Sequence, residues 1–196
     1  MQDYSEYSGN LGLGLNMAQI YQPAEDSYFF SSFLKKYLSK NKIKSYLDLG
    51  TGSGILSETA SKFLDKKNIL ATDINSDAIK ILKGEGFKTL KTNLFSGIKD
   101  KFDLITFNAP YLPRDPREPK DSQIATTGGK HGDEISIRFL KQAKKYLNKN
   151  GKVFLLISSL TPRKNIDKFK SKTIAKKKIF MEELLILEFN FSQHLS

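Results

Sequence analysis

The stretch SYLDLGTGSG, residues 45–54, joins an apolar run to three closely spaced glycines. The apolar run predicts a short buried strand, which the glycines end. Gly50, Gly52 and Gly54 then predict a strand-to-helix turn whose backbone can approach a ligand closely. By itself such a turn is a weak signal, so its meaning depends on the segments that flank it.

Strand-type and helix-type patterns alternate on both sides of this turn. Helices are predicted at 25–38, 55–64, 76–86, 133–147 and 165–171, and strands at 45–49, 68–73, 87–93, 102–108 and 151–158, with two further strands or a hairpin in 175–191. This alternation predicts an α/β fold, a single Rossmann-like domain with a seven-stranded, mostly parallel sheet and helices on both faces. Ligands of such sheets bind beyond the carboxyl ends of the strands.

The composition narrows the chemistry. The chain has 196 residues, 39% of them apolar, which suits one domain. It has no cysteine and two histidines, so disulfide frameworks, structural zinc sites and thiol nucleophiles are excluded, and no metal site is expected. The first residues lack a basic leader and no apolar run reaches about 20 residues, so we expect a soluble, cytoplasmic protein without membrane contact.

The net charge of +11 allows two interpretations. It fits a polyanionic partner such as nucleic acid, or lysine-rich helix faces that are simply solvated. Basic residues gather most densely between 163 and 178, where eight of them are opposed only by Asp167.

Carboxylates near the glycine turn indicate which cofactor it would bind. Asp48 precedes the first glycine by two residues, where it would repel a pyrophosphate and attract an ammonium or sulfonium group. The dinucleotide fingerprint would also require a glycine where the chain has Ile55. Asp73, at the end of the second predicted strand, is placed to accept hydrogen bonds from a ribose, although alone it could equally cap the next helix.

Two residues at the end of the third predicted strand complete a nucleoside pattern. Leu94 would lie against an adenine face and Asn93 near its edge, although Asn93 is equally suited to an ordinary turn. A cofactor with an amine, a sulfonium, a ribose and an adenine is S-adenosylmethionine. The sequence therefore predicts a class I methyltransferase.

The stretch FDLITFNAPYLPRD, residues 102–115, ends the fourth predicted strand beside this site. The Asn108 oxygen and a backbone carbonyl near Ala109 would accept from a planar NH2 group and orient its nitrogen toward the methyl. Pro110 fixes the turn, and Tyr111 offers an aromatic face to the planar group and to the sulfonium. We therefore expect Asn108, Pro110 and Tyr111 to be catalytic, with Asn108 also bordering the cofactor, and no strong general base is required.

Together the segments YQPAEDSYFF, LDLGTGSG, ATDIN, FNAPYLP and TTGGKHGDEISIRFL resemble the short archaeal and eukaryotic branch of the HemK-type glutamine methyltransferases. That family methylates the glutamine of the Gly-Gly-Gln tripeptide in class I peptide release factors. The resemblance implies S-adenosylmethionine as the cofactor and a methyltransferase domain at 21–196 after an N-terminal extension at 1–20. It also implies cofactor contacts from Ser27, Asp48, Gly50, Asp73, Asn93 and Leu94, and it matches Asn108, Pro110 and Tyr111 to the family's substrate-amide motif. We expect Gly52 of the glycine turn and Asn108 to contact the cofactor as well.

The sequence departs from the family pattern at two positions. The tetrapeptide is usually Asn-Pro-Pro-Tyr, whereas this chain has Ala109, which should be tolerated because the position contributes a backbone carbonyl. The position at the adenine edge is usually aspartate, whereas here it is Asn93, an uncharged acceptor. The resemblance also implies a small zinc-binding activator subunit that covers an exposed sheet edge, for which 87–93 is a candidate.

Three other functions remain as alternatives. An adenine amino group in DNA or RNA has the same planar shape as a glutamine amide, although the sequence shows no target-recognition domain. A protein lysine is a further possible substrate, and a non-catalytic adenosyl-binding scaffold would retain the fold. The loop at 112–132 is expected either to close over the substrate, with Gly128, Gly129 and Gly132 as flexible points, or to be a disordered connector.

Overall fold

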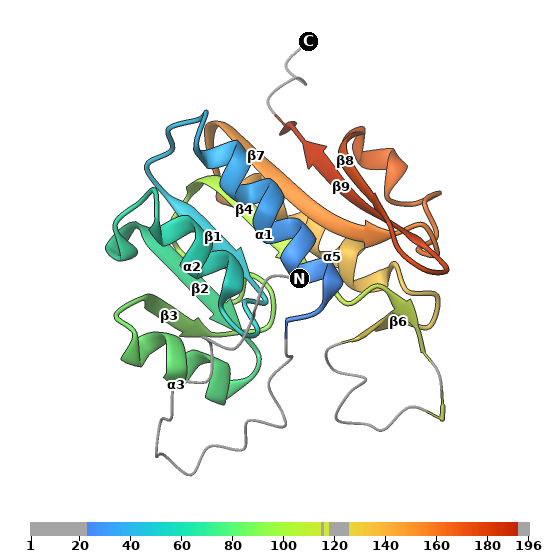
Figure 1. Ribbon diagram of the computed structural model, residues 1–196, viewed down its shortest axis with the longest axis horizontal. Coiled ribbons are helices and arrows are strands. Elements are labelled where there is room, and N and C mark those ends of the chain that lie inside the picture. Colours follow the sequence, from blue (N-terminus) through green and yellow to red (C-terminus); the bar gives the residue numbers. More distant parts are fainter. Residues whose placement is uncertain (1–22, 115, 118–125, 192–196) are drawn as a thin grey trace.

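The computed structural model describes residues 23–114, 116–117 and 126–191 (Figure 1). The extension predicted at 1–20 lies outside these residues. Among the helices that are described, none is both long enough and apolar enough to cross a membrane.

A seven-stranded sheet forms the centre of the molecule, in the order β3-β2-β1-β4-β7-β9-β8 (Figure 1). Its strands are β1 (Tyr46–Leu49), β2 (Ile69–Asp73), β3 (Lys88–Lys91), β4 (Phe102–Asn108), β7 (Leu147–Ser158), β8 (Ser171–Lys178) and β9 (Glu183–Phe189). The first five in spatial order are parallel, and β9 runs antiparallel between β7 and β8. The predicted fold class and strand number are therefore confirmed, and the strand order reverses between β1 and β4.

Helices cover both faces of this sheet, as predicted. They are α1 (Glu25–Leu38), α2 (Ile55–Ser61), α3 (Ser76–Gly84) and α5 (Glu134–Ala143), with single 3-10 turns η3 (Lys66–Asn68), η4 (Lys144–Tyr146) and η5 (Asp167–Phe169). One apolar core joins the sheet to α1, α2 and α3, and the other joins it to α5. In α1 the residues Phe30, Leu34 and Leu38 recur at helical spacing and are buried, each contributing about 1.5–3 kcal/mol.

Several element boundaries differ from the prediction. The helix expected at 165–171 is only the 3-10 turn η5, and α2 ends at Ser61 rather than at 64. Strand β7 begins at Leu147 instead of 151, because the register with β4 jumps between the pairs Phe102↔Leu147 and Leu104↔Lys152 and the intervening residues bulge. The long loop after β4 holds a second small sheet, formed by β5 (Leu112–Pro113) and β6 (Thr127–Gly129).

The two edge strands of the main sheet are β3 and β8. The first is the segment that the sequence offered as an activator edge. The second carries part of the basic cluster, including Lys172, Lys176, Lys177 and Lys178. Lysines on an edge strand discourage pairing with another strand, so their presence on both edges is also a safeguard against aggregation.

Candidate active site

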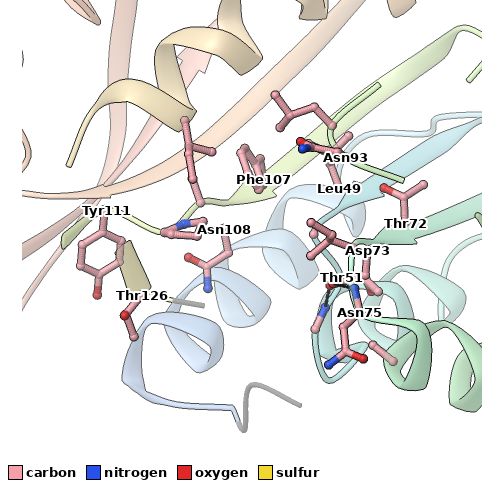
Figure 2. Close-up of a pocket in the computed structure, with 18 of the residues that line it drawn as sticks. Leu49, Thr51, Thr72, Asp73, Asn75, Asn93, Phe107, Asn108, Tyr111 and Thr126 are labelled. Atoms are coloured by element: carbon pink, nitrogen blue, oxygen red, sulfur yellow. Dashed lines mark hydrogen bonds between the residues drawn. The ribbon is translucent and has the colours of Figure 1, made fainter. Parts of the chain in front are cut away.

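A cavity of about 830 Å³ lies at the carboxyl ends of β1, β2 and β4, where the strand order reverses. Nine of the ten residues predicted for the site line it: Ser27, Gly50, Gly52, Asp73, Asn93, Leu94, Asn108, Pro110 and Tyr111. The tenth, Asp48, lies behind this lining. In Figure 2, Asn108 and Tyr111 lie on one side of the cavity, and Thr51, Asp73 and Asn93 lie on the other.

The glycine turn has a conformation that other residues adopt only with strain. Gly50, Gly52 and Gly54 have φ values of 65°, 53° and 86°. A Cβ atom on Gly50 would also lie 2.9 Å from Cε2 of Phe107 in β4, and one on Gly54 would lie 2.5 Å from Cδ2 of Leu82 in α3. Close packing between elements therefore requires Gly50 and Gly54, and the close approach of this turn to a ligand stays a prediction.

Asp48 anchors this turn from below. Its Oδ2 accepts hydrogen bonds of 2.7 Å from both Thr51 Oγ1 and Ser57 Oγ, whereas its Oδ1 is buried and has no hydrogen-bond partner among residues 23–114, 116–117 and 126–191. Burial raises the pKa of the Asp48 carboxyl to about 6, although the hydrogen bonds from Ser57 and Thr51 oppose the rise. The Asp48 carboxylate is thus a buried acceptor next to the glycine turn, and burial destabilises its negative charge. A nearby cationic group would stabilise that charge.

This pKa predicts an unusual pH dependence of stability. A carboxyl whose pKa is raised on folding binds protons more tightly in the folded state, so its contribution to the free energy of unfolding falls as the pH rises from about 4 to about 6. Asp48→Asn removes that contribution. Without cofactor, the variant should be more stable than wild type at pH 8 by up to about 3 kcal/mol, and the difference should shrink toward pH 4. Urea unfolding at both pH values measures it, and a difference independent of pH would contradict the assigned pKa.

Asp73 lies at the end of β2 with both carboxylate oxygens held by backbone groups. Oδ2 accepts from the Gly52 nitrogen and Oδ1 from the Asn75 nitrogen, each at 2.8 Å. Burial raises its pKa, and these N–H bonds lower it. Asn75 rather than Asp73 provides the side-chain cap of α3, through a 2.8 Å bond from the Asp77 nitrogen. Asp73 is thus fixed in the cavity wall with lone pairs remaining, which suits the predicted ribose contact.

Asn93 and Leu94 follow β3 and border the same cavity. Leu94 is buried and has a φ of 52°, a left-handed conformation that is uncommon for a residue other than glycine. Backbone strain of this kind costs about 1–3 kcal/mol and is often found at ligand sites. The side chain of Asn93 is exposed in the cavity region, so its predicted place near an adenine edge is available.

Asn108 ends β4, and its side-chain amide is oriented by a residue that the sequence analysis did not assign to the site. Asn108 Nδ2 donates to Asp26 Oδ2 at 3.1 Å, while Asn108 Oδ1 is buried and has no hydrogen-bond partner within the part of the chain that the structure describes. Asp26 is buried in the first turn of α1, and its Oδ1 accepts from the Ser27 nitrogen at 2.6 Å. The PAEDS segment contained the signal for this role, because it places a carboxylate beside Ser27.

The backbone after Asn108 is enclosed by the glycines of the long loop. A Cβ atom on Gly128 would overlap the Gly132 oxygen and lie 2.6 Å from the Pro110 oxygen, and one on Gly132 would lie 2.6 Å from the Tyr111 oxygen. Close packing therefore requires glycine at 128 and 132, and the role of these residues as flexible points stays a prediction. Glu134 stabilises this arrangement by accepting from the His131 and Gly132 nitrogens at 3.0 and 3.1 Å.

Tyr111 packs against the core on the α1 side of the sheet and remains a neutral phenol. Burial raises its pKa above the ordinary tyrosine range, and the charges of Asp26 and Glu182 add to the effect. The residue before the proline, Ala109, is buried. Both fit the predicted arrangement of a carbonyl and an aromatic face beside the Asn108 amide.

Comparison with known proteins agrees with this geometry. The model of the family "Methyltransferase small domain" matches residues 29–181. The chain is 38% identical over 183 residues to the "Putative protein N5-glutamine methyltransferase" of Methanocaldococcus jannaschii, covering 86% of this chain and 90% of that one. It is 26% identical over 206 residues to the human "Methyltransferase HEMK2", covering 95% and 96% of the two chains.

A bacterial relative and a solved structure extend the comparison. The "Release factor glutamine methyltransferase" of Borreliella burgdorferi is 36% identical over 132 residues, which are 60% of this chain and 46% of that one. The crystal structure of a ribosomal protein L11 methylase from Lactobacillus delbrueckii superimposes with a TM-score of 0.62 at 20% identity, covering 87% and 82% of the chains, which shows the shared fold. The chain therefore belongs to the methyltransferase small domain family and, within it, to the HemK-type protein N5-glutamine methyltransferases.

Proposed function

We propose that this methyltransferase transfers the methyl group of S-adenosylmethionine to the side-chain nitrogen of a glutamine, and that this glutamine belongs to the Gly-Gly-Gln tripeptide of a class I peptide release factor. The observation that carries the proposal is the orientation of Asn108. Its nitrogen is engaged by Asp26, and its oxygen, which is buried at the cavity wall, has no hydrogen-bond partner among the described residues. An acceptor at that place suits a substrate that presents an NH2 group.

The residues around the cavity fit the cofactor. When bound, S-adenosylmethionine supplies an electrophilic methyl group on a positively charged sulfur. Asp73 would accept hydrogen bonds from the ribose, and Leu94 and Asn93 would hold the adenine. The unpaired Asp48 Oδ1 offers negative charge beneath the turn, where the cofactor's amino group would be stabilised. Ser27, Gly50 and Gly52 would complete the contacts from the wall.

The substrate side of the cavity fits a planar amide. An amide nitrogen is a poor nucleophile because its lone pair is delocalised into the carbonyl. Asn108 Oδ1 and the carbonyl of Ala109 would accept its two N–H groups and favour a tetrahedral nitrogen, with its lone pair directed at the methyl group that the bound cofactor would supply. Tyr111 would hold the amide plane against its ring. The proton leaves the nitrogen after the transfer, so the site does not need a strong base.

The names of the relatives support glutamine and the release factor. The Methanocaldococcus protein is named for glutamine N5-methylation and the Borreliella protein for release factors. An activator subunit on the β3 edge stays a prediction from the resemblance, supported by the position of β3 at the edge of the sheet.

Mass spectrometry tests this function. A class I release factor incubated with the protein and S-adenosylmethionine should gain the mass of one methyl group on its Gly-Gly-Gln peptide, and a factor with alanine in place of that glutamine should gain none. Equal methylation of both factors, or methyl on a lysine or on nucleic acid, would contradict the proposal. Calorimetric titration with the cofactor, combined with this assay, distinguishes the enzyme from a non-catalytic adenosyl-binding scaffold. Cofactor binding without methyl transfer to any substrate would favour the scaffold.

A further inference from the structure

The turn of the hairpin between β8 and β9 carries two apolar side chains that do not pack in the core. Phe180 is 96% exposed and Met181 is 78% exposed. They are the two central residues of a tight turn that is closed by a 2.9 Å bond from the Ile179 nitrogen to the Glu182 oxygen. Such turn positions are usually occupied by glycine, asparagine or aspartate, and burial cannot explain an aromatic ring and a thioether in solvent.

Strand register places this tip at the same edge of the sheet as the active site. Ser158, the last residue of β7, pairs with Leu184 near the start of β9, so residues 179–182 extend beyond the carboxyl end of β7. Asn108 in β4 pairs with Leu156, two residues before that end. In Figure 1 the turn between β8 and β9 lies on the β6 side of the molecule.

Side-chain contacts connect the base of the hairpin to the catalytic wall. Lys177 forms a 3.0 Å ion pair with Glu25, the residue before Asp26 in α1. Glu182 contacts Ser158, and its negative charge is one of the influences that raise the pKa of Tyr111. The tip is therefore held in a fixed relation to the residues that would grip the substrate amide.

A third exposed apolar residue lies on the loop beside the hairpin. Leu160 is 55% exposed, and its nitrogen donates to Ser158 Oγ at 3.0 Å. The neighbouring Ser159 nitrogen donates to the Glu183 oxygen at 2.7 Å, so this loop and the hairpin are joined. We call Leu160, Phe180 and Met181 the tip surface.

We infer that the tip surface is the docking surface for the protein substrate, and that it contacts an apolar segment of polypeptide flanking the residue to be methylated. This inference rests on the proposed function. The grip around Asn108 would recognise only a planar amide, so affinity for a particular macromolecule must come from contacts outside the cavity. Aromatic and methionine side chains are enriched in protein interfaces, and methionine adapts readily to an irregular partner.

Charge favours a protein over a nucleic acid as the occupant. Of the three lysines at the end of β8, Lys176 pairs with Glu183 at 3.4 Å and Lys177 pairs with Glu25, whereas Lys178 is exposed. The tip itself contributes no positive charge, whereas contacts to nucleic acid depend on lysine and arginine at phosphates.

The test is the double variant Phe180→Ser/Met181→Ser, assayed on an intact release factor and on a short peptide that contains Gly-Gly-Gln but none of the flanking surface. We expect kcat/KM on the intact factor to fall about tenfold or more through KM, as for loss of an interface hot spot. Turnover of the peptide, cofactor affinity and melting temperature should be unchanged, because both side chains lie in solvent. The control is Phe63→Ser, which replaces an exposed aromatic residue past the carboxyl end of α2. This variant should leave kcat/KM unchanged on both the intact factor and the peptide.

Three results would overturn the inference. One is an unchanged kcat/KM on the intact factor. Another is an equal loss on factor and peptide, which would mean that the tip acts on the catalytic residues themselves. The third is a wild-type dimer in sedimentation that the variant dissociates without any kinetic change, which would assign the tip to a second copy of the chain. If wild type methylates neither substrate, the proposed function fails, and the docking role fails with it.

Discussion

Asn108→Ala should abolish methyl transfer while leaving cofactor binding nearly intact. The variant removes the acceptor that would hold the substrate nitrogen, and removing one such preorganised group typically costs about 10²–10³ in kcat. Here the loss should reach the upper end of that range or exceed it, because the same group would also position the nucleophile. Single-turnover assays measure the transfer, and titration calorimetry measures the dissociation constant of S-adenosylmethionine.

Asn93→Ala is the matched control, because it truncates another asparagine of the same cavity. It should weaken cofactor binding and leave the rate at saturating cofactor largely unchanged, the reverse of Asn108→Ala. If Asn108→Ala loses cofactor binding and turnover together, Asn108 is a structural residue and its catalytic role is refuted.

Among alanine substitutions of the glycines that the structure describes, Gly128→Ala should be the most damaging. The added Cβ would overlap the Gly132 oxygen and crowd the Pro110 oxygen, both backbone atoms that cannot rotate away. Overpacking of this kind costs about 1–3 kcal/mol, and relief of the overlap would displace the backbone beside Asn108. We expect a lower melting temperature and, for the fraction that folds, a fall in kcat on the Gly-Gly-Gln peptide.

Gly84→Ala provides the comparison for this variant. Gly84 ends α3, and no atom lies within 4 Å of the position that its Cβ would take. Alanine there should be neutral or stabilise the protein by about 0.4–1 kcal/mol. Equal effects of the two substitutions on melting temperature and kcat would show that the contact between the long loop and the Asn-Ala-Pro-Tyr segment is not important.

Hydrophobic periodicity accounts for much of the predicted fold. The apolar stripe at Phe30, Leu34 and Leu38 specifies α1, and the mostly apolar run at 102–107, which includes Asp103 and Thr106, specifies the buried strand β4. Hydrophobic periodicity did not predict the correct element where the periodic segment was short or its pattern was mixed. Seven residues at 165–171 could not sustain a helix and formed a single 3-10 turn, and the bulge in β7 depends on a register that only the neighbouring strand determines.

The sequence predicted the location of those site residues that lie at the carboxyl end of a strand. Asp73 is the last residue of β2, Asn93 follows the end of β3, and Asn108 is the last residue of β4. Because these strands are parallel, their ends lie at the same edge of the sheet. The role of Asp26 could not be derived in that way, because PAEDS indicates only a carboxylate beside Ser27, and the partner of Asp26, Asn108, is 82 residues away. The packing requirement at Gly128 and Gly132 was not predictable for the same reason, since it arises from the backbone of residues 110 and 111 on another part of the loop.

The most direct test of the central claim uses S-adenosylmethionine with a ¹³C-labelled methyl group, in one reaction that contains an intact class I release factor and ribosomal RNA. NMR and fragment-ion mass spectrometry then locate the label. We predict a single labelled methyl on the side-chain nitrogen of the Gly-Gly-Gln glutamine, and none with the Asn108→Ala protein. Label on a lysine or on an adenine instead of that glutamine, or equal labelling by Asn108→Ala, would contradict the assignment of this protein as a glutamine methyltransferase that acts through Asn108.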